Sequence, residues 1–128
     1  MRFLDMFRNW KDVEEHRAGT VIFLEQDPAD VMYVIISGEV GLTLHGEPLS
    51  TERKGGVIGE MAMINSATCG TTATTLSEVK LARLDRDQLK AFIDENTDFA
   101  LHVMAVMANR LRAVDKYIDM RFAQMDSR

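Results

Sequence analysis

The spacing of hydrophobic positions changes near residue 85. Between residues 19 and 84 the apolar residues fall in short runs, some alternating with polar residues, and turn-forming residues separate the runs. Alternation with a period of two is typical of half-buried strands, and several short strands at this spacing predict a sandwich, roll or barrel. The clearest expected strands lie at 21–24, 32–36, 40–44, 71–76 and 79–84.

Helical spacing flanks this β section on both sides. An N-terminal helix within residues 3–17 is predicted by four apolar residues on one stripe, Phe3, Met6, Phe7 and Trp10. After the β section, Asp85 and Gln88 have the spacing of a capping box, which predicts a helix that starts there and ends near Asn96.

A longer helix is predicted from Thr97 or Asp98 to about Phe122. Five of its apolar residues recur at alternating steps of three and four: Met104, Met107, Leu111, Val114 and Ile118. Such a heptad seam has two interpretations, packing against the chain's own roll or pairing with a second copy in a homodimer. We favour the homodimer.

Composition predicts one soluble domain over residues 1–128. The 128 residues are 46% hydrophobic and 27% charged, and the formal net charge of −5 gives no general attraction to nucleic acid or to an anionic membrane. No apolar stretch has the length of a membrane span or the pattern of a signal peptide. With a single cysteine, Cys69, an internal disulfide is excluded, which agrees with a cytoplasmic location.

Candidate catalytic groups are scattered. His16, His45 and His102 stand far apart, whereas a metal-dependent jelly-roll enzyme needs a close His-x-His pair and further ligands. Cys69 has no flanking cation to lower its pKa, which favours a small buried thiol over a nucleophile. We therefore expect no metal site, no catalytic residues and no enzymatic activity.

The most informative segment is Gly59-Glu60-Met61-Ala62-Met63. A glycine that opens a short helix leaves backbone N–H groups pointing outward, which suits a phosphate. A carboxylate one residue later would repel that phosphate, but it can accept a hydrogen bond from a sugar hydroxyl. The segment thus suits a ribose phosphate; the plain alternative is a helix start that carries a solvated acid.

Three stretches of the chain, one of which contains this segment, carry a family resemblance by their order and spacing. They lie at 19–40, 56–62 and 79–87. Together they resemble the cyclic nucleotide-binding domain family, from about residue 13 to about residue 118. The resemblance implies an eight-stranded jelly-roll over about 19–84, with an N-terminal helix, a short helix in the phosphate-binding cassette, and hinge and long C-terminal helices over about 85–122. These helices would shift when ligand binds.

The same resemblance assigns the expected ligand contacts. Gly59 and the amides of Met61 and Ala62 would face the cyclic phosphate, and Glu60 would accept the ribose hydroxyl. Two threonines would lie beside the phosphate or the base. The full expected set is Ile58, Gly59, Glu60, Met61, Ala62, Gly70, Thr71 and Thr72.

The sequence departs from the family at two positions. The arginine that pairs with the phosphate falls at Gly70, and residues 61–77 contain no charge at all. Losing a charge-assisted hydrogen bond should weaken nucleotide binding by roughly 1.5–3 kcal/mol. The second departure is Gln26, where the family usually has a glycine. The candidates to replace the missing cation are Arg53, Lys54 and Arg83.

These features predict a stand-alone regulatory module that binds cyclic AMP, cyclic GMP or a related phosphorylated effector. It would require no cofactor and would signal through its C-terminal helices to a protein partner that the sequence does not identify. The alternative is a degenerate module that has lost nucleotide binding and serves in protein interaction or dimerisation.

We expect no nucleic-acid partner. DNA-binding relatives continue into a helix-turn-helix unit, and the ten residues after Ile118 are too few for one. Basic residues of the last helix are interleaved with Asp115 and Asp119, which predicts a solvated face: Arg110, Arg112, Lys116 and Arg121.

Overall fold

The chain forms a β-roll followed by two helices. The computed structural model describes residues 5, 7–63 and 67–126. The described strands are β1 (Val13–His16), β2 (Val21–Phe23), β3 (Val31–Ser37), β4 (Val40–Leu44), β5 (Glu47–Glu52), β6 (Val57–Ile58), β7 (Thr72–Thr75) and β8 (Val79–Asp85). The described helical elements are the 3₁₀ turn η1 (Glu60–Met63), α2 (Arg86–Glu95) and α3 (Thr97–Asp126).

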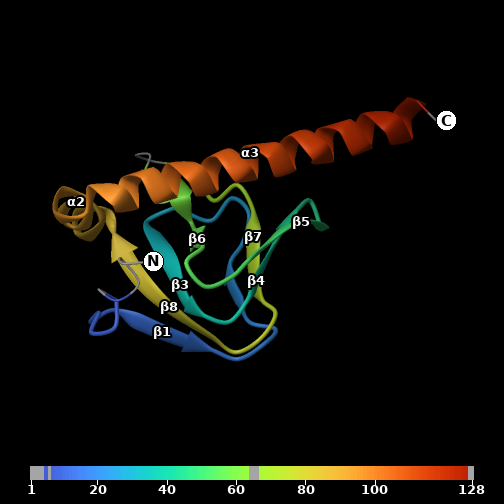
Figure 1. Ribbon diagram of the computed structural model, residues 1–128. Coiled ribbons are helices and arrows are strands. Elements are labelled where there is room, and N and C mark those ends of the chain that lie inside the picture. Colours follow the sequence, from blue (N-terminus) through green and yellow to red (C-terminus); the bar gives the residue numbers. More distant parts are fainter. Residues whose placement is uncertain (1–4, 6, 64–66, 127–128) are drawn as a thin grey trace.

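The strands form two antiparallel sheets. Their orders are β1-β8-β3-β6 and β2-β7-β4-β5, so strands distant in sequence lie side by side. Figure 1 shows α2 at one end of the roll and α3 passing across it, with the far end of α3 projecting beyond β5. The expected eight strands, jelly-roll class and C-terminal helices are confirmed for the described residues, but the roll begins with β1 at Val13 instead of at about residue 19.

Two clusters of buried side chains form the core. One lies between the sheets and includes Tyr33 and Ile35; the other lies between the first sheet and the helices and includes Met32 and Val34. These four residues alternate along β3, so both faces of this strand are covered. That is why the sequence shows a continuous apolar run there rather than an alternating one.

The N-terminal helix predicted over residues 3–17 is wrong for its second half. Val13–His16 form β1, which pairs with the edge of β8, and residues 7–9 form a turn. An open strand edge offers unpaired backbone groups, and this pairing satisfies them. Of the predicted stripe, Phe3 and Met6 lie outside the described residues, while Phe7 stacks on Phe92 of α2.

The helix boundaries agree well with the sequence pattern. The Asp85 carboxylate accepts from the Gln88 amide at 2.8 Å and the Gln88 side chain accepts from the Asp85 amide at 2.9 Å, which confirms the capping box. Asn96 is the C-cap of α2, as expected. Helix α3 continues to Asp126, a turn beyond the predicted end, and neither described helix is both long and apolar enough to cross a bilayer.

Candidate functional site

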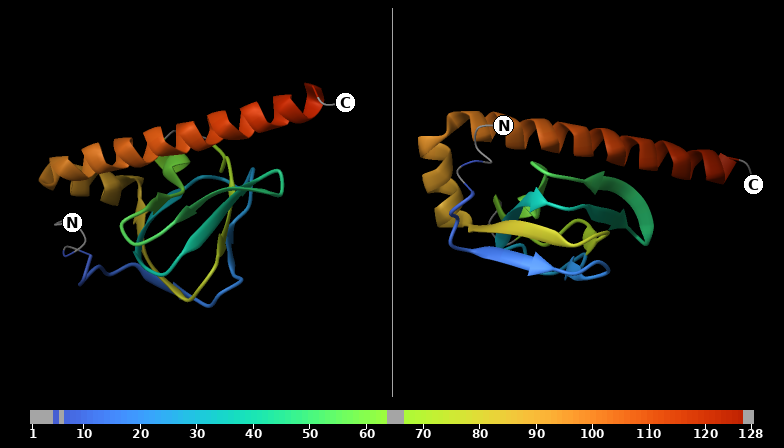
Figure 2. Two further views of the ribbon diagram at one scale, coloured as in Figure 1. Left: turned by 45° about the vertical axis from the view of Figure 1, so that its right-hand side comes forward. Right: turned by 60° about the horizontal axis from the view of Figure 1, so that its bottom comes forward.

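A cavity of about 280 Å³ lies where α3 passes over the cassette. Figure 2 shows α3 following the side of the roll that carries η1 and β5. The lining comes from β4, β5, the cassette, the following loop and α3: Leu44, Leu49, Gly59, Glu60, Met61, Cys69, Gly70, Thr71, Met107, Arg110, Leu111 and Val114. Most of these side chains are apolar, so the cavity combines an apolar wall with one carboxylate and one guanidinium.

Gly59 determines how the cassette enters the cavity. Its φ is +74°, and a Cβ added there would lie 2.8 Å from the carbonyl oxygen of Val31. Only glycine meets both conditions without strain, and the chain then turns directly into η1. The Ala62 amide donates to the Gly59 carbonyl at 3.1 Å, so in this structure it closes the turn instead of facing the cavity.

The loop after η1 is held against the turn between β2 and β3. The Cys69 amide donates to the Asp27 carbonyl at 2.8 Å, and the Gln26 amide donates to the Cys69 carbonyl at 2.9 Å. Gln26 has a φ of +75°, a conformation in which glycine carries no side-chain penalty. This explains physically why a glycine suits the position, and it shows that the departure at Gln26 leaves the turn intact.

Cys69 is a buried thiol, as predicted. Burial, and then the negative charges of Asp27, Glu60 and Asp30, raise its pKa above the ordinary value. The thiol therefore stays protonated and acts as part of the cavity wall.

Glu60 is joined to α3 by a buried ion pair. Arg110 reaches the Glu60 carboxylate through Nη1 at 2.6 Å and the Glu52 carboxylate through Nη2 at 2.8 Å. Its Nη2 also donates to the Val57 carbonyl at 2.8 Å. Arg110 is 8% exposed, so one arginine ties the long helix to β5, β6 and the cassette.

Arg110 stays protonated although its side chain is buried. Desolvation opposes the charge, but the charges and hydrogen bonds of Glu60 and Glu52 outweigh it and raise the pKa of the guanidinium. Two carboxylates and one guanidinium leave the group with a net negative charge. Among the described residues that line the cavity, Arg110 is the one cation.

The predicted solvated face is therefore wrong at Arg110. The inward stripe of α3 runs through Phe99, Val103, Met107, Arg110 and Val114 at steps of three and four. Arg110 lies three residues after Met107 and four before Val114, a periodicity that could have placed it inward. Because Arg110 is basic, it was predicted to be exposed. That prediction holds for the other three basic residues named with it.

The structure brings five of the eight expected ligand residues to the cavity. They are Gly59, Glu60, Met61, Gly70 and Thr71. Three do not line it: Ile58 is fully buried between the sheets, Ala62 packs in the core beneath the helices, and the Thr72 hydroxyl accepts from the Glu25 amide. Ile58 and Thr72 lie in strands, where side chains alternate between the two faces, and Ala62 lies on the inner side of the 3₁₀ turn η1.

The candidate replacement cations lie elsewhere on the molecule. Arg53 pairs with Glu39 at 2.8 Å and is 69% exposed, and Arg83 approaches Glu14 at 3.6 Å. Neither these two nor Lys54 lines the cavity. Among the residues that the structure describes, no three histidine, cysteine or acidic side chains come together as a metal site would require.

The predicted seam of α3 divides between two faces. Met107 packs against the core beneath the helices and Val114 is half-buried on the roll. Three members are exposed instead: Met104, Leu111 and Ile118. Packing against the roll is therefore confirmed for Met107 and Val114, and pairing with a second copy stays a prediction for the exposed members.

Comparison with known families gives a match over most of the roll and the hinge helix. Residues 13–96 match the family described as the cyclic nucleotide-binding domain. The chain is 28% identical over 116 residues to a CRP-like cAMP-activated global transcriptional regulator of Mycobacterium tuberculosis, covering 86% of this chain and 52% of the regulator. It is 32% identical over 84 residues to a cAMP-dependent protein kinase regulatory subunit of Emericella nidulans, covering 64% and 20% of the two chains.

Solved structures share the architecture. The catabolite activator protein of Thermus thermophilus superimposes with a TM-score of 0.72 at 25% identity, over 93% of this chain and 58% of that protein. The c-di-GMP-responsive regulator CLP of Xanthomonas campestris gives a TM-score of 0.77 at 20% identity, over 92% and 60% of the two chains. The chain thus spans about half the length of the bacterial regulators that it matches.

Proposed function

Because the chain belongs to the cyclic nucleotide-binding domain family, we propose that its cavity binds a cyclic nucleotide and that α3 transmits occupancy of the cavity to a partner protein. The relatives that it matches are a transcriptional regulator and kinase regulatory subunits, which supports a sensor or regulatory module. The module itself carries no reaction in this proposal and has no DNA partner of its own.

One observation supports this proposal most directly: Glu60 of the cassette is paired with Arg110 of α3 at 2.6 Å. The residue that would accept a ribose hydroxyl is therefore the residue that holds the long helix. A ligand hydroxyl that takes the Glu60 oxygen now bonded to Arg110 weakens or rearranges that contact. Since it would bind the rearranged conformation better, its binding shifts the helix population.

The proposed contacts follow from this geometry. Glu60 accepts the ribose hydroxyls, Gly59 and Met61 approach the phosphate, and Thr71 lies beside the phosphate or the base. The apolar wall, which includes Leu49 and Val114, covers the flat faces of the base. Cyclic AMP and cyclic GMP are the ligands that the family suggests, and no cofactor is required.

A second candidate function is favoured by a different observation. Gly70 provides no cation, and the Ala62 amide and Thr72 hydroxyl already have partners within the protein. A module with these features and an exposed apolar face on α3 could serve in protein interaction or dimerisation without a nucleotide.

Calorimetry of the purified chain against cyclic AMP and cyclic GMP tests the first proposal, with cyclic di-GMP as a third ligand. Glu60→Ala should lower the affinity for a cyclic nucleotide by about ten- to hundredfold, because it removes a charged hydrogen bond to the ribose. The affinity for a 2′-deoxy analogue should fall much less. Glu47→Ala is the matched control, since it removes an ion pair to Arg121 of α3 outside the cavity. Absence of binding to all three ligands would favour the second function.

A further inference from the structure

The cavity has a phosphate-binding cassette without a cassette cation. Gly70, where the family places an arginine, is exposed and has no side chain. Arg53 and Arg83 pair with other acids, and neither they nor Lys54 line the cavity. A cyclic phosphate placed beside Glu60 would therefore be left with a net negative neighbourhood unless some other residue compensates.

Arg110 is positioned to be that residue. It lines the cavity, is more than nine-tenths buried, and reaches the cassette from the opposite wall. Its Nε is buried and has no hydrogen-bond partner among the described residues. A buried guanidinium nitrogen without a partner is costly, and a ligand oxygen would remove that cost.

We propose that Arg110 is the phosphate-binding cation of this site, supplied by α3 in place of the missing cassette arginine. The inference rests on the proposed function, since it assumes that the ligand is a cyclic nucleotide. On binding, the ribose hydroxyls replace the guanidinium as the partner of Glu60. Nη1, released from Glu60, then donates to the phosphate, while Nε–H, on the edge it shares with Nη2, can donate to a second ligand oxygen.

Glu52 makes this exchange feasible. It holds Nη2 of Arg110 at 2.8 Å, and the Val57 carbonyl accepts from the same nitrogen at 2.8 Å. These contacts lie outside the Glu60 pair, so they keep the guanidinium in place when Glu60 changes partner. Arginine suits this role better than lysine, because its planar fork can serve a carboxylate and a phosphate from different edges.

The test compares a cyclic nucleotide with the corresponding nucleoside, which has the base and ribose but no phosphate. The variant Arg110→Gln with Glu52→Gln removes one cation and one carboxylate together, so the net charge beside Glu60 is unchanged. The control is Arg121→Gln with Glu47→Gln, which removes one cation and one carboxylate from an ion pair of α3 outside the cavity. Titrations followed by NMR with cyclic AMP and adenosine, and with cyclic GMP and guanosine, reach the weak affinities expected of the nucleosides.

We expect the double variant to lose about ten- to hundredfold in affinity for the cyclic nucleotide, with less than about twofold change for the nucleoside. Arg121→Gln with Glu47→Gln should change both ligand affinities little, because this pair lies outside the cavity. An equal loss for cyclic nucleotide and nucleoside would overturn the phosphate role and make Arg110 a positioning residue. Unchanged or tighter binding of the cyclic nucleotide would also overturn it. Arg110 would then only pair with Glu60 in the ligand-free chain and make no contact with the phosphate.

Two further results keep the test decisive. A wild-type chain that binds adenosine or guanosine no more weakly than the cyclic nucleotide would overturn the inference while leaving the cavity as a ligand site. A wild-type chain that binds no cyclic nucleotide would overturn the proposed function and this inference together. If the double variant does not fold, Arg110→Lys retains the charge, and several-fold loss confined to the cyclic nucleotide is then the expected result.

Discussion

At the scale of single residues, two positions decide what the cavity can bind. Arg110 supplies a charge that the cassette lacks, and it is held by two carboxylates from different elements. Gly70 leaves the opposite position without a side chain, and a Cβ built there would meet no atom within 4 Å. The site is therefore crowded and charged on the α3 side and open at Gly70.

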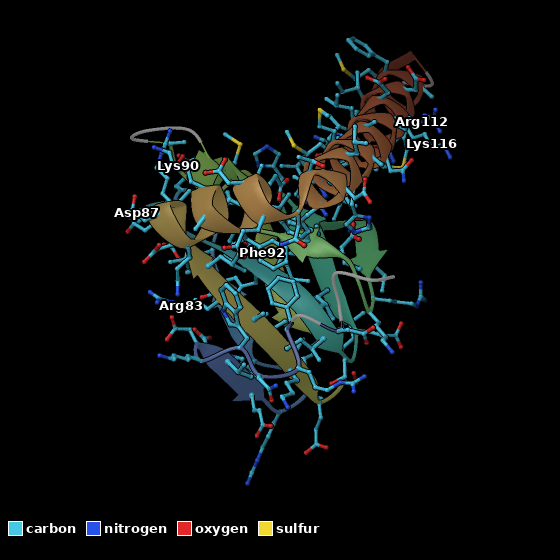
Figure 3. The ribbon with its side chains drawn as sticks, turned by 60° about the vertical axis from the view of Figure 1, so that its left-hand side comes forward. Arg83, Asp87, Lys90, Phe92, Arg112 and Lys116 are labelled. Carbon is cyan, nitrogen blue, oxygen red and sulfur yellow. The ribbon has the colours of Figure 1, made fainter. Side chains whose placement is uncertain are left out.

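Removing Arg110 should destabilise the fold. Arg110→Met leaves the half-buried carboxylates of Glu52 and Glu60 without their cation, so the free energy of unfolding should fall by about 3 kcal/mol, the lower end of the range for a buried pair. Urea denaturation measures the change. Arg112→Met is the matched control, because Arg112 projects outward from α3 (Figure 3) and is exposed, and it should stay within about 0.5 kcal/mol of wild type. Similar losses for both variants would contradict a structural role for the buried pair.

Introducing a cation at Gly70 should strengthen nucleotide binding. Gly70 has neither a positive φ nor a close neighbour, so Gly70→Arg should fold with wild-type stability. Its guanidinium would face the cyclic phosphate and raise the affinity for cyclic AMP or cyclic GMP by about ten- to hundredfold in calorimetry. Thermal unfolding provides the control. A folded variant with unchanged affinity would argue against a phosphate beside Gly70.

At the scale of elements, α3 carries two different faces. One face packs on the roll through residues such as Val103 and Arg110. The other is exposed along most of the helix and follows a heptad pattern from residue 101 to residue 125. Its members are Leu101, Met104, Ala108, Leu111, Asp115, Ile118, Phe122 and Met125. A stripe of this kind is typical of a helix that pairs with another helix, so we propose that it is the homodimer surface.

A charge in this stripe should separate the dimer. Ile118→Glu is a cleaner choice than Leu111→Glu, because Leu111 also lines the cavity. The variant should sediment as a monomer at tens of micromolar, where a wild-type dimer of micromolar affinity would form. Ala123→Glu adds the same charge to the exposed helix outside the stripe and should leave the dimer intact. A monomeric wild-type chain in the same ultracentrifugation would remove the homodimer proposal.

At the scale of the whole molecule, the N-terminal segment, α2 and α3 share one aromatic cluster. Phe7 stacks on Phe92 with ring centroids 4.8 Å apart, and Phe92 meets Phe99 edge to face at 4.8 Å. Trp10 lies 5.9 Å from Phe92 and donates its indole N–H to the Arg83 carbonyl of β8 at 2.9 Å. Phe92 points from α2 toward the roll (Figure 3), so movement of the hinge helix must disturb this cluster.

The one tryptophan of the chain therefore reports on the hinge helix. If ligand binding shifts α2, the emission of Trp10 should change in wavelength or intensity as the cavity fills, because its contacts with Phe92 and Arg83 change. Fluorescence titration with cyclic AMP or cyclic GMP measures the change, and Glu60→Ala at the same ligand concentration is the control. Calorimetric binding with an unaltered emission spectrum would mean that the hinge stays in place.

Local sequence pattern was enough for most elements of this protein. Short apolar runs predicted five of the eight described strands, and Asp85 with Gln88 marked the start of α2, because periodicity and capping depend on neighbours within a few residues. The resemblance on the segment from Gly59 to Met63 located the cassette. Five of the eight expected ligand residues reach the cavity for the same reason, since they lie on one short stretch of chain or just after it.

Tertiary structure alone decided the partners of those elements. Residues 13–16 form a strand because they pair with the edge of β8, and the packing of α3 on the roll places Arg110 against Glu52 and Glu60. The periodicity of α3 is compatible with an inward Arg110, but its acidic partners lie fifty or more positions away and have no local signal. A basic residue on a helix is exposed unless such a distant acid compensates its burial. Only the packed molecule could therefore show that the cassette faces its cation across the cavity, on another element.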